Sequence, residues 1–186
     1  MKKILLIITL LTSVSCTYYN QKIDLNLNLT QIESNIGNDA LVSVFIFDKR
    51  SDRKVIGEKI FGQKVITISA NQRLNALLRE KIRDNLALKG FRSGRTSTLK
   101  LYIESLDYKS ERGFPVGKSE ASATIKVVAH NTESEKTLTK NFNLNLNGNH
   151  FISSLKSTDE EIINSLLEEV IQNIMDDESI LDILAK

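Results

Sequence analysis

Apolar and polar residues alternate along several stretches of the chain with a period of two, which is typical of a β-strand with one buried face. The first stretch, 23–29, is rich in asparagine, so we predict an edge strand there. The two stretches 120–130 and 136–146 are joined by a short polar turn and predict a hairpin. Threonine and asparagine line the outer face of its second strand, as expected for a face in contact with water. Further strands are predicted at 54–60, 64–68 and 98–108.

Residues 41–47 (LVSVFIF) are apolar at nearly every position instead of alternating. A run of this kind favours a central strand that is covered on both faces.

Two longer stretches carry apolar residues at spacings of three and four, the period of an amphipathic helix. The first helix is predicted over 70–89, with a capping box formed by Ser69 and Gln72 at its start. The second is predicted over 158–175. Acidic residues 176–178 then interrupt the apolar pattern, which predicts a break and a short C-terminal helix.

These elements predict an α/β (α+β) fold with a mixed sheet of about five to six strands. Two main helices pack on one face, and a short C-terminal helix completes the domain. We predict that residues 41–186 form this single domain, and that residues 16–40 form a tether with the possible edge strand.

The first 16 residues differ from the rest of the chain. Lys2 and Lys3 precede the apolar run 4–11, and small residues lead through Ser15 to Cys16, the one cysteine in the sequence. This order is typical of a secretory signal, and the run is too short for a membrane-spanning helix. We predict a lipoprotein signal peptide over 1–15, cleaved between Ser15 and Cys16, with lipids attached to Cys16. The alternatives are an ordinary cleaved signal beside an unrelated cysteine, and a free cysteine in the core.

Removing the signal changes the charge of the chain. The whole sequence has 25 basic and 23 acidic side chains, and Lys2 and Lys3 are lost with the signal, so the mature chain has 25 − 2 = 23 of each. A neutral chain gives no electrostatic reason to bind nucleic acid.

Charged residues concentrate in one segment, 48–54, directly after the apolar run 41–47. Asp48, Arg50 and Arg53 are candidate binding residues there, because an arginine at a strand end can clamp an anion. The alternative is a solvated turn in which the charges pair locally, with about 0–1 kcal/mol per pair.

Other chemistry is not indicated. The sequence contains no glycine-rich phosphate loop and no metal-ligand spacing, and neither His130 nor His150 belongs to a nucleophile motif. We therefore predict no catalytic residue, no metal and no cofactor. A hydrolase that uses two carboxylates distant in the sequence is the one enzyme class left open.

The segment ITISANQRLNALLREKIRDNLALKGF (66–91), the strand entering 48–50, the strand TLTKNFNLNLNG (137–148) and the C-terminal SILDIL (179–184) resemble the YajG-like family of bacterial lipoproteins. This resemblance implies lipidation at Cys16 and a protein that faces the periplasm. Thr17 follows the cysteine where aspartate would retain a lipoprotein in the inner membrane, so the resemblance to other lipoproteins favours the outer membrane.

The predicted function is a non-catalytic binding or scaffolding module of the cell envelope. Its partners would be the membrane, through the lipids on Cys16, and an envelope protein or glycan. The alternatives are a domain that binds a small molecule or ion through 48–53, and a cell-wall hydrolase.

Overall fold

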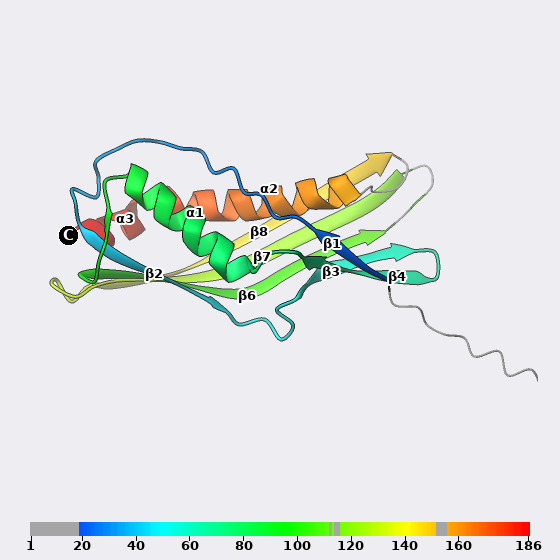
Figure 1. Ribbon diagram of the computed structural model, residues 1–186, viewed down its shortest axis with the longest axis horizontal. Helices are drawn as coiled ribbons and strands as arrows, with labels where there is room; N and C mark the ends of the chain where they lie inside the picture. Colours follow the sequence, from blue (N-terminus) through cyan, green and yellow to red (C-terminus); the bar gives the residue numbers. More distant parts are fainter. Residues whose placement is uncertain (1–18, 112, 114–115, 152–155) are drawn as a thin grey trace, which may run out of the picture.

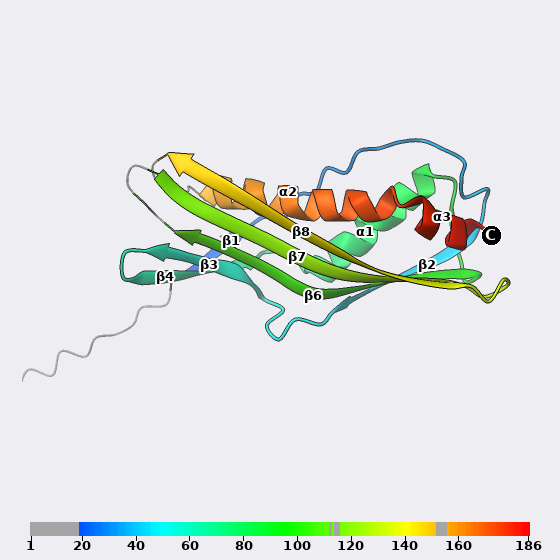
Figure 2. The same cartoon turned by 180° about the vertical axis from the view of Figure 1, so that it is seen from behind.

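The computed structural model describes residues 19–111, 113, 116–151 and 156–186, so Ser15 and Cys16 lie outside the described residues. It shows one mixed sheet with three helices on a single face (Figures 1 and 2), which confirms the predicted fold class. In chain order the elements are β1 (Tyr19–Ile23), β2 (Leu41–Asp48), β3 (Val55–Phe61), β4 (Lys64–Ala70), α1 (Leu74–Leu88), β5 (Arg92–Ser93), β6 (Ser97–Glu111), β7 (Val116–Asn131), β8 (Thr137–Phe151), α2 (Lys156–Met175) and α3 (Glu178–Ala185).

Strand β6 is the centre of the sheet. One of its edges pairs antiparallel with β7, which in turn pairs with β8 in the predicted hairpin. The other edge is shared by two parallel strands placed end to end, because β2 pairs with residues 97–103 and β3 with residues 108–111. Beyond them lie β5 on one side, and β4 and then β1 on the other.

The chain leaves the sheet between β2 and β3. Residues 49–54 form a loop opposite the part of β6 where the pairing with β7 shifts, between Ile103 and Ser105. Gly57 brings β3 back against β6, where a Cβ atom would lie 2.0 Å from the carbonyl oxygen of Tyr108. The return of β3 to the sheet therefore requires glycine at this position, and the loop is held between two fixed strand ends.

The three helices cover one face of the sheet and enclose the core. Helix α2 packs on β7 and β8, α1 on β2, and α3 on β6 and β7. Within the part of the chain that the structure describes, no helix combines the length and apolar character needed to cross a bilayer. The core is formed by alternate residues of the strands and one stripe of each helix, including Leu99, Leu101, Ile103, Ile125, Leu78, Ile82, Ile163, Leu166, Ile171 and Leu184.

The predicted start of the first helix is wrong by four residues. Strand β4 continues to Ala70 because it pairs with β1, so α1 begins at Leu74, after Arg73 as its N-cap. The expected capping box is not formed. Ser69 donates a hydrogen bond to Asn20 instead, and Gln72 accepts one from the backbone N–H of Leu25.

The alternating stretch 23–29 has a helix as its partner, which corrects the predicted edge strand. Strand β1 ends at Ile23, and the following segment runs extended along α2 with Leu25 and Leu27 buried in the core. Two residues of extended chain advance about 6.6 Å and four helical residues about 6 Å, so the two periods nearly match. The backbone N–H groups of Asp24, Asn26, Asn28 and Thr30 accordingly donate to the side chains of Glu160, Asn164, Glu168 and Gln172.

Candidate functional site

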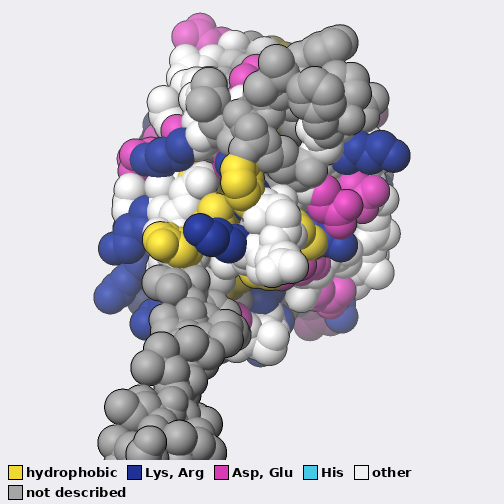
Figure 3. All heavy atoms as spheres, turned by 90° about the vertical axis from the view of Figure 1, so that its right-hand side faces the viewer, with side chains coloured by type: hydrophobic (Ala, Val, Ile, Leu, Met, Phe, Trp, Pro, Cys, Tyr) yellow, Lys and Arg dark blue, Asp and Glu magenta, His cyan; other side chains and the backbone are white. Residues whose placement is uncertain are grey.

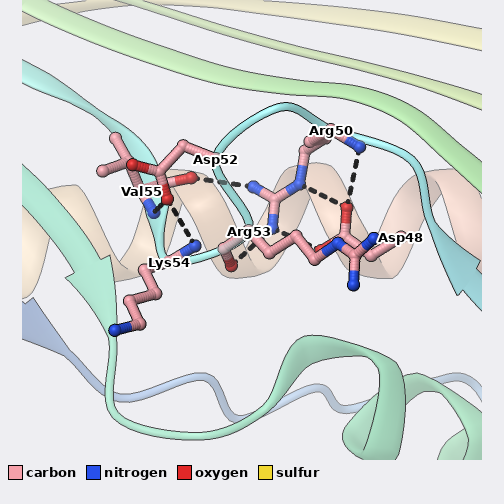
Figure 4. Close-up of polar contacts among 6 residues, drawn as sticks. All are labelled: Asp48, Arg50, Asp52, Arg53, Lys54 and Val55. Carbon is pink, nitrogen blue, oxygen red and sulfur yellow. Dashed lines mark hydrogen bonds and ion pairs between the residues drawn. The ribbon is translucent and has the colours of Figure 1, made fainter.

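The loop after β2 is closed by a buried ion pair (Figure 4). Arg50 donates from Nε to Asp48 Oδ1 at 2.9 Å and from Nη2 to Asp48 Oδ2 at 2.8 Å. It also donates to the backbone carbonyl oxygens of Arg53 and Val55. Both charged side chains are less than a tenth exposed, at 6% and 8%. These hydrogen bonds of the Arg50 guanidinium are all made within the segment 48–55, and they fix its path.

Asp52 shapes the second half of the same loop. Its carboxylate accepts hydrogen bonds from the backbone N–H groups of Lys54 and Val55. These bonds favour the ionised form and lower the pKa of Asp52. Both acidic residues of the loop are thus engaged in holding its shape.

A cleft of about 940 Å³ opens between this loop and the segment that leads from β4 into α1. Its polar wall includes residues of β1 and β4 as well as both of these connections. Six cationic and two acidic side chains line the cleft: Lys22, Lys49, Arg50, Arg53, Lys54 and Arg73, with Asp48 and Asp52.

Most of these cations have no carboxylate partner. Among the residues that the structure describes, no ion pair involves Lys22, Arg53, Lys54 or Arg73, all of which are exposed. Lys49 lies on the loop as well, with its Nζ 5.9 Å from the centre of the Tyr102 ring. The two acids are committed to the loop, so the cleft presents an excess of positive charge.

The structure brings the three candidate residues of the loop to one wall of this cleft. Asp48 and Arg50 pair with each other, while the Arg53 side chain is exposed and forms no ion pair with the described residues. Sequence reasoning missed Lys22 and Arg73, which reach the cleft from β1 and from the start of α1. Arg73 falls inside the helix predicted over 70–89, whereas the structure places it before Leu74 as the N-cap of α1.

A row of aromatic side chains lies on the face of the sheet that no helix covers. Phe45 and Phe47 are 41% and 38% exposed, and the Phe47 ring stacks on Tyr102 of β6 at 5.1 Å between centroids. The prediction that residues 41–47 are covered on both faces is therefore wrong. The apolar outer face of β2 is half-covered by ring stacking with its neighbours, and this leaves an exposed apolar strip beside the loop.

A second set of buried charges forms a separate centre around Asp159, in the first turn of α2. The Asp159 carboxylate accepts hydrogen bonds from Lys59 at 2.7 Å, Tyr108 at 2.7 Å and Gln21 at 2.8 Å. Asp159 has no exposed surface, and neither it nor Lys59 nor Tyr108 lines the cleft. Burial and the neighbouring Asp159 raise the pKa of Tyr108, so this hydroxyl stays protonated. The centre ties α2 to three strands.

No group of three or more histidine, cysteine, aspartate or glutamate residues is arranged to hold a metal ion within the described part of the chain.

Comparison with known proteins places the chain among lipoproteins. The model of a family described as uncharacterised lipoprotein matches residues 12–185. No curated protein shows significant sequence similarity. A crystal structure of a Xanthomonas campestris protein from the family DUF330 is similar in fold, with a TM-score of 0.59 and 9% identity over 83% of this chain and 92% of that one. An uncharacterised protein of known structure has a TM-score of 0.51 and 12% identity over 83% and 97% of the two chains. At these identities the similarity concerns the fold alone.

Proposed function

The chain belongs to the YajG-like family of uncharacterised lipoproteins, and from this premise we propose that it is a non-catalytic binding module of the cell envelope. In this proposal, lipids on Cys16 hold the protein in the outer membrane, facing the periplasm. The cationic cleft binds an anionic partner, which is a carboxylate- or phosphate-bearing glycan or an acidic protein segment.

The observation that carries the proposal is the set of exposed, unpaired cations around one hollow. Lysine and arginine are almost never fully buried unless they are paired. Here Lys22, Arg53, Lys54 and Arg73 are exposed, line one cleft and form no ion pair with the described residues. The start of α1 adds to the positive potential, because Arg73 as N-cap offers no side-chain acceptor to the first N–H groups of the helix. An anionic ligand would satisfy both features.

Binding is favoured over hydrolysis by the state of the acidic residues. A paired-carboxylate hydrolase needs two carboxylates directed at the substrate. The two that line the cleft, Asp48 and Asp52, already accept hydrogen bonds from Arg50 and from the loop backbone. We therefore assign the cleft a binding role.

The proposal is tested by reversing two charges of the cleft in the full-length, anchored protein. The variant Arg53→Glu/Arg73→Glu changes two exposed residues on opposite walls. The matched control, Arg79→Glu/Arg95→Glu, makes the same change at two exposed arginines outside the cleft. Isolated cell-wall sacculi are mixed with each protein and sedimented. In parallel, a photo-cross-linking residue at Asn75, which lines the cleft, captures bound protein in cells.

We expect the wild type and the control to sediment with the sacculi, or to cross-link to one cellular protein. The cleft variant should do neither. Binding should also weaken with added salt, because exposed charges are screened. Equal retention by both double variants would contradict the proposal.

A small anionic molecule is the second candidate ligand, supported by the size of the cleft. Its volume of about 940 Å³ is within the range of small-molecule sites, about 300–1,000 Å³. This candidate predicts that citrate or inorganic phosphate raises the melting temperature of the wild type and not of Arg53→Glu/Arg73→Glu, while sacculi and cellular proteins are not retained.

A further inference from the structure

One end of the molecule exposes apolar side chains around the point where the described chain begins. Tyr19 opens β1 and is 50% exposed, while Phe61 and Val65 flank the turn between β3 and β4 and are 41% and 43% exposed. Figure 3 looks onto this end and shows hydrophobic and basic side chains together on it. We call Tyr19, Phe61, Lys64 and Val65 the hairpin tip.

The three segments of the hairpin tip are neighbours in the sheet. Tyr19 is in register with Ile66 of β4, and Phe61 is in register with Lys64 across the turn. The Lys64 ammonium lies 5.6 Å from the centre of the Tyr19 ring. Gly62 has φ +61° in the turn, a conformation suited to glycine, so the tip protrudes as a tight hairpin.

The composition of the tip suits a lipid headgroup region. Aromatic rings with a polar edge and lysines with long apolar stems are favoured where hydrocarbon meets water. The stretches 19–23 and 60–66 contain Lys22 and Lys64 and no acidic residue. Anionic phospholipids would therefore meet no like charge in these stretches.

Covalent geometry sets the distance from this tip to the predicted anchor. Tyr19 is three residues after Cys16. Three residues span at most about 11 Å even when fully extended. If lipids on Cys16 are inserted in a bilayer, Tyr19 must lie close to its surface, and the exposed side chains beside Tyr19 come with it.

We propose that the hairpin tip is a membrane-contact surface that inserts Phe61 and Val65 among phospholipid headgroups and orients the domain on the bilayer. This inference rests on the lipid anchor at Cys16 in the proposed function and adds a second, protein-borne contact. Strands run along the long axis of the molecule, away from this end (Figures 1 and 2). Val55, on the far wall of the cleft, lies six positions before Phe61 in β3, so this wall would stand about 20 Å from the headgroups, while Asn20 and Lys22 of β1 line the cleft nearer to the bilayer.

The test uses the absence of tryptophan from the chain, which makes an introduced tryptophan a unique reporter. Full-length, lipidated Phe61→Trp is reconstituted into vesicles of phosphatidylethanolamine and phosphatidylglycerol, with and without brominated acyl chains that quench nearby indoles. The matched control is Phe45→Trp, because Phe45 is also 41% exposed but lies on the open sheet face. Flotation of both proteins with the vesicles, compared with Cys16→Ser, measures anchoring separately.

We expect both tryptophan variants to float and Cys16→Ser to remain soluble. Brominated lipid should then quench most of the emission of Phe61→Trp and shift it to the blue, leaving Phe45→Trp unchanged. If both variants float but Phe61→Trp is not quenched, the tip does not touch lipid and the inference is wrong while the anchor stands. If neither floats, the anchor fails and the inference fails with it.

Discussion

Two regions of this molecule concentrate charge, and they use it in opposite ways. Around Asp159 the charges are buried, opposite in sign and joined by short hydrogen bonds to Lys59, Tyr108 and Gln21. Around the cleft most of the charges are exposed and positive, and apart from the Asp48–Arg50 pair its cations form no ion pair with the described residues. The first arrangement holds three strands to a helix, and the second has its charge available to a ligand.

The two regions differ in how much hydration free energy each charge gives up in the folded state. A buried ion without compensation loses its hydration, so its partner is part of the folded state. An exposed cation keeps its hydration and contributes little to folding, whether paired or not. Mutations in the two regions should therefore separate stability from binding.

The largest effect is expected at Asp159. Replacing it by asparagine removes the negative charge that the buried Lys59 ammonium faces, and we expect Asp159→Asn to lower the free energy of unfolding by about 3–5 kcal/mol. Urea denaturation of the full-length protein measures this loss. The control is Glu161→Gln, an exposed acid on the same helix, which should change stability by less than about 0.5 kcal/mol. A small effect of Asp159→Asn would mean that the centre is not what joins α2 to the sheet.

A smaller effect with a distinct pH dependence is expected at Tyr108. The pKa of its hydroxyl is raised in the folded state, so the unfolded chain loses this proton first as the pH increases. The stability contributed by the protonated hydroxyl is therefore complete below about pH 10 and falls by about 1.4 kcal/mol per pH unit above it, until the folded pKa is reached.

We expect Tyr108→Phe to cost about 1–3 kcal/mol at neutral pH, because the hydrogen bond to Asp159 is lost. Above pH 10 the variant should lose stability less steeply than the wild type. The measurement is the free energy of unfolding between pH 8 and pH 11. Parallel curves for the two proteins would show that this hydroxyl titrates in the same way when folded and unfolded.

The sequence was most informative where one period repeats over many residues. The hairpin of β7 and β8 and helix α2 were predicted from periods of two and near four, and the break before α3 coincides with Asp177, whose side chain caps that helix. The type of each of these elements is set by its local residue pattern, and the tertiary contacts agree with that pattern.

Periodicity failed where a long-range partner decided the structure. The alternation in 23–29 correctly identified the buried leucines, but it could not distinguish a helix from a strand as the partner. The pairing of β4 with β1 moved the start of α1, and with it the position of Arg73. The segment 48–54 was recognised from its charge, but the cleft was not, because its other wall comes from residues 20–22 and 67–75.

The smallest effect on stability is expected at the cleft, where it is the most informative. Arg53 and Arg73 are exposed, and neither side chain contributes an ion pair within the described structure, so Arg53→Glu/Arg73→Glu should change the free energy of unfolding by less than about 0.5 kcal/mol. Two features favour this result. Glutamate at position 73 places a negative charge at the start of α1, where the helix dipole stabilises it, and relieves repulsion among the remaining cations. Urea denaturation of this variant and of the Arg79→Glu/Arg95→Glu control measures the effect. A loss of more than about 1 kcal/mol in the cleft variant alone would mean that these cations stabilise the fold, as Lys59 does beside Asp159. A loss of binding in that variant could then not be ascribed to charge alone.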